Sequence, residues 1–339
     1  MEREQSHIRI AVDVMGGDFA PRNVVAGAVE ALQQTNNRFT LLLVGPEETI
    51  RRELSQYPHE GLAYEILNAT QTIDMHDTAT AALKQKKDSS ITVGLTAHKE
   101  GKADGFISAG HTGAVMSAST LILGRVEGVG RPTIGTFMPN EKGVCLLVDA
   151  GANVDCKPQH LYEFAVMGSI YTSAMFGIDK PTVGLLSIGE ESTKGDEVTL
   201  EAHQLISKSN LNFIGNVEGR DILKGKAHVV VCDGFVGNVV LKFAESVLDL
   251  LKAKFRAHAA KDVFRKVWVC AMYGTLKTIL KDFDYQEYGG VPLLGVNGVT
   301  IIGHGKSTPK AIKNMILRAE ETIQKKINYR IQEALATGK

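Results

Sequence analysis

A chain of 339 residues can bury a large hydrophobic core, either in one α/β domain or in two lobes. Its 38 basic residues balance its 38 acidic residues, so net charge favours neither nucleic acid nor anionic lipid as a partner. The four cysteines are far apart, and no apolar run approaches the roughly 20 residues that cross a bilayer. With no signal-peptide pattern at its start, we expect a soluble, cytoplasmic protein with reduced thiols.

The chain begins with a pattern of strand, glycine turn and helix. Residues 8–14 form an almost continuous apolar run that contains Asp13 near its end. Gly16 and Gly17 allow backbone angles that a side chain would forbid. Pro21 suits the first turn of a helix because its missing N–H would have no partner there. In a parallel sheet, this Asp and the glycines would lie at the edge where active sites form.

The rhythm of strand and helix continues along the chain. Apolar runs rich in β-branched residues predict strands at residues 8–14, 40–44, 63–67, 105–108, 143–148, 183–188, 212–215, 227–232 and 299–302. Helix-length patterns separate most of them, for example at residues 21–34, 196–208 and 238–251. This alternation predicts a doubly wound, mostly parallel sheet in an α/β/α sandwich. No internal repeat or linker is evident, so we expect residues 1–339 to form a single α/β enzyme domain, with two lobes around a cleft as the alternative.

Residues 239–283 interrupt this rhythm. They contain no proline and only Gly274, and apolar residues recur on one helical face from Phe264 through Trp268 to Phe283. Eight basic residues and one acid lie between positions 250 and 281, among them Lys254, Arg256, Lys261, Arg265 and Lys266. We predict a projecting helical pair. Its apolar stripe forms a dimer interface with a solvated basic rim, touches an anionic membrane surface, or does both, with the base of the pair for dimerisation and the tip for the membrane.

Two loops that follow predicted strands share one glycine pattern. In residues 108–114, small residues let the backbone approach an anion at a helix start, and Thr112 adds a hydroxyl. A tight turn that serves only packing explains this loop equally well. Residues 233–238 repeat the geometry, and there Asp233 and Asn238 either contact a ligand or cap the helix.

Further polar loops carry single candidate residues. Lys194 lies beside a glycine and either neutralises a bound phosphate or is a solvated surface charge. Asn216 precedes a loop with an arginine, which would suit an oxyanion. Residues 303–307 imitate an ATP-binding Gly-Lys-Ser, but the first glycine of that motif falls at Thr300. We therefore expect no nucleotide here.

Several absent motifs narrow the chemistry. The sequence has no Gly-x-Gly-x-x-Gly for a dinucleotide and no Gly-x-Ser-x-Gly for a serine nucleophile. It also has no His-x-x-x-His or cysteine cluster for a metal. We expect neither a cofactor nor a metal.

Eight segments in fixed order carry a family resemblance. They are residues 10–21, 108–114, 149–158, 184–195, 212–221, 229–242, 288–298 and 304–307. Together they resemble the bacterial phosphate acyltransferases, nearly end to end. Two positions depart from the family pattern: His111 stands where Asn is usual, and His228 where Asp is usual.

The resemblance implies a fold and a reaction. The fold would be isocitrate/isopropylmalate dehydrogenase-like or phosphotransacetylase-like. The enzyme would transfer a long-chain fatty acyl group from an acyl carrier protein thioester to inorganic phosphate. The acyl-phosphate product would feed a membrane glycerol-3-phosphate acyltransferase in phosphatidic acid and phospholipid synthesis. The resemblance also implies a homodimer that is cytoplasmic and peripherally associated with the membrane.

The site residues expected from the resemblance and the loop chemistry form three groups. Expected in catalysis are Lys194, Asp233, Asn238 and Asn216. Expected to bind phosphate or thioester are Asp13, Gly16, Gly17, Ser108, Gly110, His111, Thr112, Gly113, Gly234, His304 and Ser307. Expected to contact the membrane or the acidic carrier protein are Lys254, Arg256, Lys261, Arg265, Lys266 and Trp268.

Two alternative functions remain open from sequence. One is a phosphate acetyltransferase-like enzyme that uses acyl-coenzyme A without a carrier protein. The other is a non-catalytic scaffold that recruits lipid enzymes to the membrane through residues 250–281. The number of glycine loops at strand ends argues against a pure scaffold.

Overall fold

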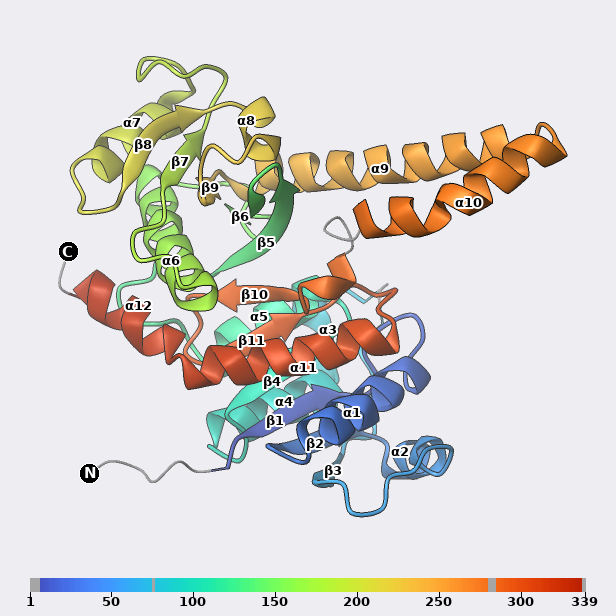
Figure 1. Cartoon of the computed structure of the whole chain (residues 1–339). Coiled ribbons are helices and arrows are strands. Elements are labelled where there is room, and N and C mark those ends of the chain that lie inside the picture. Colours follow the sequence, from blue (N-terminus) through green and yellow to red (C-terminus); the bar gives the residue numbers. More distant parts are fainter. Residues whose placement is uncertain (1–6, 75–76, 280–284, 337–339) are drawn as a thin grey trace.

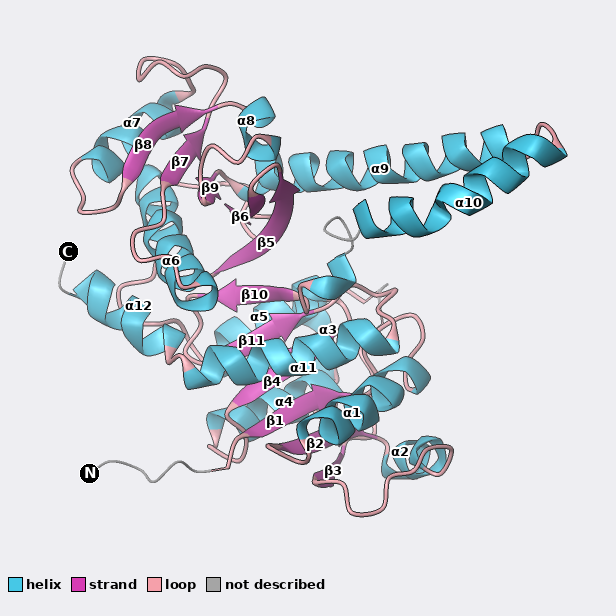
Figure 2. Ribbon diagram, viewed as in Figure 1, coloured by secondary structure: helices cyan, strands magenta, loops and turns pink. Residues whose placement is uncertain are grey.

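A single sheet of 11 strands runs through the whole protein (Figures 1 and 2). The structure is a computed structural model that describes residues 7–74, 77–279 and 285–336. In sheet order the strands are β3 (Tyr64–Asn68), β2 (Thr40–Gly45), β1 (Arg9–Asp13), β4 (Gly105–Ser108), β11 (Val299–Ile302), β10 (Val291–Leu294), β5 (Thr133–Asn140), β6 (Gly143–Val148), β9 (Val229–Val231), β7 (Val183–Leu186) and β8 (Phe213–Val217).

The sheet consists of two parallel groups joined by two antiparallel strands. Strands β3, β2, β1, β4 and β11 are parallel and form the first lobe. Strands β6, β9, β7 and β8 are parallel and form the second lobe. Strands β10 and β5 join them through antiparallel pairs. The predicted α/β fold with a mostly parallel sheet is confirmed. The sequence pattern missed β5 and β10; in the short β10, Pro292 weakens the strand signal.

Helices cover both faces of each lobe. In the first lobe, α1 and α11 pack on one face, and α4 and α5 on the other. In the second lobe, α6, α7 and α12 share one face, while α8 and the start of α9 lie on the other. The helices are α1 (Arg22–Thr35), α2 (Glu47–Leu54), α3 (Ala79–Gln85), α4 (Ser90–Lys99), α5 (Thr112–Ile122), α6 (Pro158–Phe176), α7 (Glu197–Ser207), α8 (Gly219–Leu223), α9 (Gly234–Ala259), α10 (Val263–Ile279), the 3-10 turn η2 (Tyr285–Glu287), α11 (Pro309–Gln324) and α12 (Ile327–Ala336).

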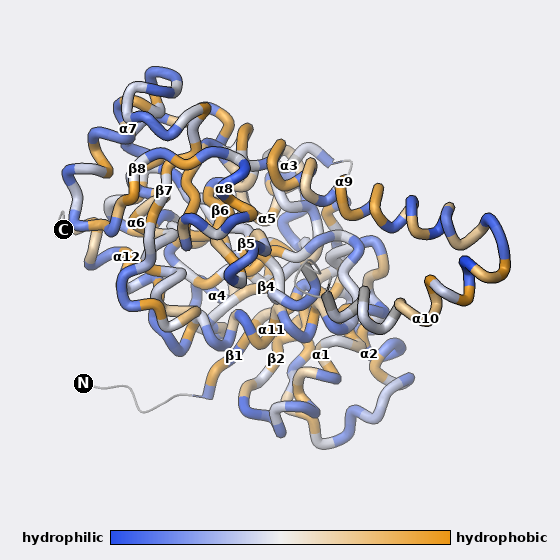
Figure 3. Tube along the Cα trace, turned by 45° about the horizontal axis from the view of Figure 1, so that its top comes forward, coloured by the Kyte–Doolittle hydropathy of each residue, from blue (hydrophilic) through white to orange (hydrophobic). Residues whose placement is uncertain are grey.

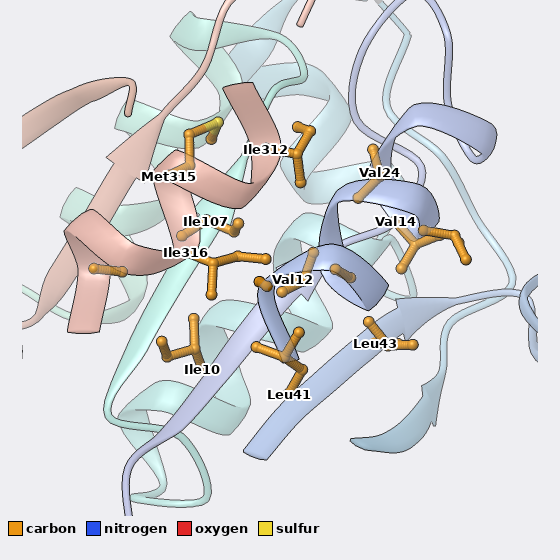
Figure 4. Packing of buried hydrophobic residues seen from close by; sticks show 14 of the residues in the cluster. Ile10, Val12, Val14, Val24, Leu41, Leu43, Ile107, Ile312, Met315 and Ile316 are labelled. Carbon is orange, nitrogen blue, oxygen red and sulfur yellow. The ribbon is translucent and has the colours of Figure 1, made fainter. Parts of the chain in front are cut away.

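The alternation of side chains along β1 explains why both of its faces are buried. Ile10 and Val12 point into the cluster under α1 and α11, whereas Ala11 joins the cluster under α4 and α5. Figure 4 shows Ile10 and Val12 among Ile312 and Ile316 of α11. Each such side chain, once buried, contributes about 1.5–3 kcal/mol of hydrophobic stabilisation. Because the strands are anchored in this core, the positions of their last residues are set, and so are the starting points of the loops that follow them.

The central register brings the two lobes' strand ends to one level. Pro292 of β10 pairs with Ile301 of β11, and Leu293 of β10 pairs with Ile134 of β5. Gly135 of β5 then pairs with Val148 of β6. Across these pairs the end of β6 at Val148 lies level with Ile301, one residue before the end of β11, and the two strands run in opposite directions. Ala150, just after β6, belongs to the same buried cluster as Ala114 and Val115 of α5. The loops of both lobes thus approach the middle of the molecule.

Helices α9 and α10 pack against each other and project from the body (Figure 1). They occupy most of the predicted segment 239–283, although α9 begins earlier, at Gly234, and residues 280–283 lie outside the described residues. Hydrophobic and hydrophilic residues alternate along the pair (Figure 3). None of the described helices combines the length and apolar composition needed to cross a membrane.

Candidate active site

In the first lobe, a buried carboxylate joins the ends of β1 and β4. Asp13 is 2% exposed, and Ser108 Oγ donates a 2.6 Å hydrogen bond to its Oδ2. Ser108 Oγ in turn accepts from the Gly110 N–H at 3.0 Å. Burial raises the pKa of the Asp13 carboxyl, and the hydrogen bond from Ser108 opposes that rise. Asp13 therefore fixes the loop after β4 rather than facing solvent.

Glycines allow the first-lobe loops to interlock. A β-carbon at Gly16 would lie 2.6 Å from Asp13 Oδ2 and 2.8 Å from the Gly110 nitrogen, so only glycine fits. Gly17 has φ +109°, and its backbone lies against the loop after β11. There the Asp18 N–H donates to the Gly305 carbonyl at 2.7 Å. Three loops, after β1, β4 and β11, therefore form one rigid unit.

The last of these loops carries His304 and Ser307. The Ser307 hydroxyl is buried and donates to the His304 carbonyl at 2.6 Å, while the His304 ring is exposed. Asn23 of α1 donates to the Ser307 carbonyl at 3.0 Å. Ser307 thus shapes the loop, and His304 is the member of this pair with an accessible side chain.

Helix α5 begins directly behind these loops. His111 is its N-cap, and its Nδ1 accepts from the Ala114 N–H at 3.2 Å. The Thr112 side chain is exposed. In the described part of the chain, the N–H groups of His111, Thr112 and Gly113 have no hydrogen-bond partner. Three consecutive free donors at a helix start suit an anion.

The second lobe has its own buried carboxylate, Asp149, which is 0% exposed. It accepts hydrogen bonds from the backbone N–H groups of Ile134 at 3.2 Å and Ala152 at 3.1 Å. It also accepts from both the backbone N–H and the side-chain amide of Asn153, at 2.6 and 2.9 Å. Burial raises the pKa of Asp149. Asp149 and Asn153 organise this loop and were absent from the sequence-based site.

Helix α9 starts in contact with the Asp149 loop. The Gly234 N–H donates to the Asn153 carbonyl at 2.7 Å, and a β-carbon at Gly237 would lie 1.9 Å from the Asp149 carbonyl oxygen. Asp233 is the N-cap and accepts from the Val236 N–H at 2.9 Å. Asp233 therefore caps the helix, as one sequence alternative proposed, and its half-buried position also leaves it beside the site.

Asn238 and Asn216 occupy different environments. Asn238 lies over Gly151, and its side-chain amide makes no hydrogen bond with the described residues. Asn216 is 2% exposed, and its amide nitrogen donates to the carbonyls of Glu191 at 2.8 Å and Lys194 at 3.2 Å. Asn216 thus holds the loop that presents the exposed Lys194 side chain.

Two thiols lie close to the Asp149 loop. Burial raises the pKa of Cys156 to about 12, and the charge of Asp149 adds to the rise. Cys232, whose Sγ contacts the Asp149 carbonyl at 3.5 Å, has its pKa raised well above the usual range for the same reasons. Both remain protonated near neutral pH, so neither supplies a thiolate nucleophile.

The sites expected on the helical pair lie well away from these loops. The Lys254, Arg256, Lys261 and Lys266 side chains are exposed, and Arg265 pairs with Asp262 at 2.9 Å. Trp268 is 59% exposed. Among the described residues, no group of three or more His, Cys, Asp or Glu side chains is placed to hold a metal ion. The loops at the strand ends, rather than the helical pair, are therefore the candidate site.

Comparisons with known proteins place the chain in a family. A family model described as fatty acid synthesis protein matches residues 8–330. A phosphate acyltransferase from Pelotomaculum thermopropionicum is 47% identical over 97% of this chain and 95% of that protein. Another, from Desulforamulus reducens, is 46% identical over 98% of both chains.

A solved structure confirms the predicted phosphotransacetylase-like fold. A phosphotransacetylase from Streptococcus pyogenes superposes with a TM-score of 0.62 at 19% identity, covering 95% of this chain and 94% of that chain. At this identity the match shows the fold alone. The sequence relatives carry the assignment of activity, and phosphate acyltransferases are enzymes. The chain belongs to the fatty acid synthesis protein family of phosphate acyltransferases, as its sequence motifs predicted.

Proposed function

We propose that this enzyme transfers a long-chain fatty acyl group from an acyl carrier protein thioester to inorganic phosphate. The products are an acyl-phosphate, for phosphatidic acid synthesis, and free carrier protein. The observation that carries the proposal is the set of N–H donors of residues 111–113, which are free among the described residues and lie next to the Asp13–Ser108 hydrogen bond. Together with the family of acyl-to-phosphate enzymes, this set supports an anionic acceptor.

The reaction needs no covalent enzyme intermediate. A phosphate oxygen attacks the thioester carbonyl carbon, the new C–O bond forms, and the C–S bond breaks as the carbonyl is restored. The thiolate leaves and takes up the proton that the hydrogen phosphate loses. A thiol with a pKa of about 8.5 departs with little acid assistance. The protonated state of Cys156 and Cys232 agrees with direct attack by phosphate.

Positioning then supplies most of the catalysis. Holding phosphate and thioester in attack geometry can contribute about 7–11 kcal/mol to lowering the barrier. Each donor that stabilises the tetrahedral oxyanion can add about 3–4 kcal/mol. In our proposal the loop of residues 108–113 and Lys194 hold phosphate. Asp233 and Asn238 orient the phosphate or the thioester, and Asn216 acts through the loop that carries Lys194.

The helical pair has a separate proposed role. Its tip exposes Phe264 and Trp268, which are 88% and 59% exposed, beside the basic residues. We assign the base of the pair to homodimerisation and the tip to the membrane surface, where a membrane glycerol-3-phosphate acyltransferase would receive the product. The basic residues would also attract the acidic carrier protein. Unchanged liposome binding after deletion of the tip would contradict the membrane assignment.

The test of the reaction is product formation from defined substrates. Purified enzyme is incubated with palmitoyl-acyl carrier protein and phosphate, and palmitoyl-phosphate is followed by mass spectrometry. We expect product only when both substrates are present. Equal turnover of palmitoyl-coenzyme A would favour the coenzyme A alternative. No product with either donor, while liposome binding persists, would favour the scaffold.

A further inference from the structure

The two lobes contain the same strand-and-loop unit, although the sequence showed no evident repeat. In the first lobe, Val12 of β1 pairs with Ile107 of β4, and in the second, Val148 of β6 pairs with Val231 of β9. A buried Asp lies at the end of the first strand in each lobe: Asp13 is the last residue of β1, and Asp149 directly follows β6. After a further loop each first strand leads to a helix, where an Asp precedes a proline by three positions, at 18 and 21 and again at 155 and 158.

The second strand of each unit leads into a matching glycine loop. Residues 108–113 read Ser-Ala-Gly-His-Thr-Gly, and residues 232–237 read Cys-Asp-Gly-Phe-Val-Gly. In both units a glycine lies against the buried Asp. A β-carbon at Gly110 would meet Asp13 Oδ2 at 3.4 Å, and one at the equivalent Gly234 would meet Asp149 Oδ2 at 2.8 Å. The repeat escapes notice in the sequence because the loop after Asp149 is one residue longer.

The two copies differ in the donors that they offer. In the first lobe, the N–H groups of residues 111, 112 and 113 are free among the described residues. Of the equivalent groups in the second lobe, the Val236 and Gly237 N–H groups donate to Asp233, and only the Phe235 N–H is free among the described residues. The Asp233 carboxylate also places a negative charge at the start of α9. The second copy is therefore unsuited to an anion, whereas the first suits one.

The copies also differ in their exposed side chains. Where the first lobe has His111 and Thr112, the second has Phe235 and Val236. Phe235 is 64% exposed. Val154, next to the Asn153 that binds Gly234, is 63% exposed, and Val239, one turn after Phe235, is 53% exposed. Exposed apolar side chains beside a catalytic loop suit an apolar ligand.

We propose that the two copies have divided the substrates: the first-lobe unit holds phosphate, and the second-lobe unit holds the acyl group. Phe235 and Val154, which lie before the helical pair of residues 239–283, contact the acyl chain and determine donor specificity. Asp149 is a positioning residue that holds the Asn153 loop against α9, as Asp13 does for the phosphate loop. This inference rests on the proposed function, since it assigns the two substrates of that reaction.

Reciprocal substitutions test the division by steady-state kinetics. Phe235→His gives the second copy the side chain of the first, and we expect KM for palmitoyl-acyl carrier protein to rise roughly tenfold. KM for phosphate should stay within about twofold, because that site is untouched. Thr112→Val should do the reverse and raise KM for phosphate roughly threefold to tenfold. Leu121→Ser, at an equally exposed apolar site on α5, is the control and should change neither KM.

Two further measurements make the test more specific: one varies the length of the donor's acyl chain, and the other measures phosphate binding directly. The effect of Phe235→His should shrink with a butyryl donor, whose short chain makes less apolar contact. Equal effects on butyryl and palmitoyl donors, or a rise only in the phosphate KM, would overturn the assignment. Calorimetry with inorganic phosphate alone separates this inference from the reaction itself. Binding weakened by Thr112→Val but kept by Phe235→His supports the division even without turnover, and the opposite pattern contradicts it.

Discussion

The loops at the strand ends bury polar groups, whereas the projecting helical pair exposes apolar ones. The loops bury carboxylates, and Asp13 and Asp149 are at most 2% exposed, with hydrogen bonds satisfying both. The helical pair instead exposes large apolar side chains, Phe264 and Trp268 among them. A buried polar network that is satisfied fixes geometry, as catalysis requires. An exposed apolar stripe becomes buried only when it binds a partner or a membrane surface.

We expect the largest difference between the two regions when one glycine in each is replaced by alanine and activity and stability are compared. Gly16→Ala places a β-carbon 2.6 Å from Asp13 Oδ2 and 2.9 Å from Ser108 Oγ, so the loop must shift. We expect kcat/KM for palmitoyl-phosphate formation to fall at least about 100-fold, since a misplacement of about 1 Å has that effect. The free energy of unfolding should fall by about 1–3 kcal/mol.

Gly274→Ala in α10 is the matched control. Apart from the backbone of α10 itself, no described residue lies within 4 Å of its added β-carbon. Alanine in a helix interior is favoured by up to about 1 kcal/mol, so stability should stay the same or rise and turnover should be unchanged. Comparable losses in the two variants would mean that the loops are no more constrained than the helical pair.

Charge at the tip of the helical pair should govern membrane association. Replacing Lys261, Arg265 and Lys266 by Gln removes three cations, each contributing about 1 kcal/mol at most near anionic lipid. Sedimentation with phosphatidylglycerol vesicles should show binding weakened by up to roughly 100-fold at low salt. Turnover of palmitoyl-acyl carrier protein at saturating concentration should remain, because the loops are distant. Binding that is insensitive to these charges would leave dimerisation as the role of the stripe.

The second-lobe loop should depend on Asn153. Asn153→Ala removes the amide that donates to Asp149 at 2.9 Å and to the Pro132 carbonyl at 2.8 Å. A buried acceptor left without its donor costs about 1–3 kcal/mol, which chemical denaturation would detect. We also expect kcat to fall, since the start of α9 rests on this loop. A variant with unchanged stability and kcat would show that the backbone bonds to Asp149 suffice.

The smallest expected effect is a pH dependence of the free energy of unfolding. It comes from His98, which lies outside the candidate site. His98 Nε2 accepts from the Val299 N–H at 3.0 Å, so its Nδ1 carries the proton donated to the Ala103 carbonyl at 2.9 Å. Burial lowers the pKa of His98, and Asp104 partly opposes this. The folded state therefore binds the proton less well than the unfolded chain. Stability from this site is present above about pH 6.5 and is lost as pH falls, by at most about 1.4 kcal/mol per pH unit.

Thermal unfolding between pH 7 and 5 measures this effect. His98→Gln keeps one donor and one acceptor but does not titrate, so its unfolding should vary less with pH than that of the wild type. Parallel pH curves for the two proteins would assign the dependence to other groups.

The sequence predicted the parallel strands and the glycine loops because those patterns are local. Long-range contacts could not be predicted in this way: Ser108 and Asp13 are 95 positions apart, and His98 and Val299 are 201 apart. The hydrogen bond between Asp149 and Asn153 is local. The Val-Asp pair at the end of a predicted strand, at residues 12–13 and again at 148–149, could therefore have pointed to Asp149 as a site residue. The roles of Lys194, Asp233 and the other site residues stay predictions.

The most direct measurement is the initial rate of palmitoyl-phosphate formation as phosphate concentration is varied at fixed palmitoyl-acyl carrier protein. A phosphate acceptor held in the first-lobe loops predicts a rate that saturates with phosphate and whose KM for phosphate rises in Thr112→Val. Thioester loss at a rate independent of phosphate, with palmitate as the product, would contradict the account.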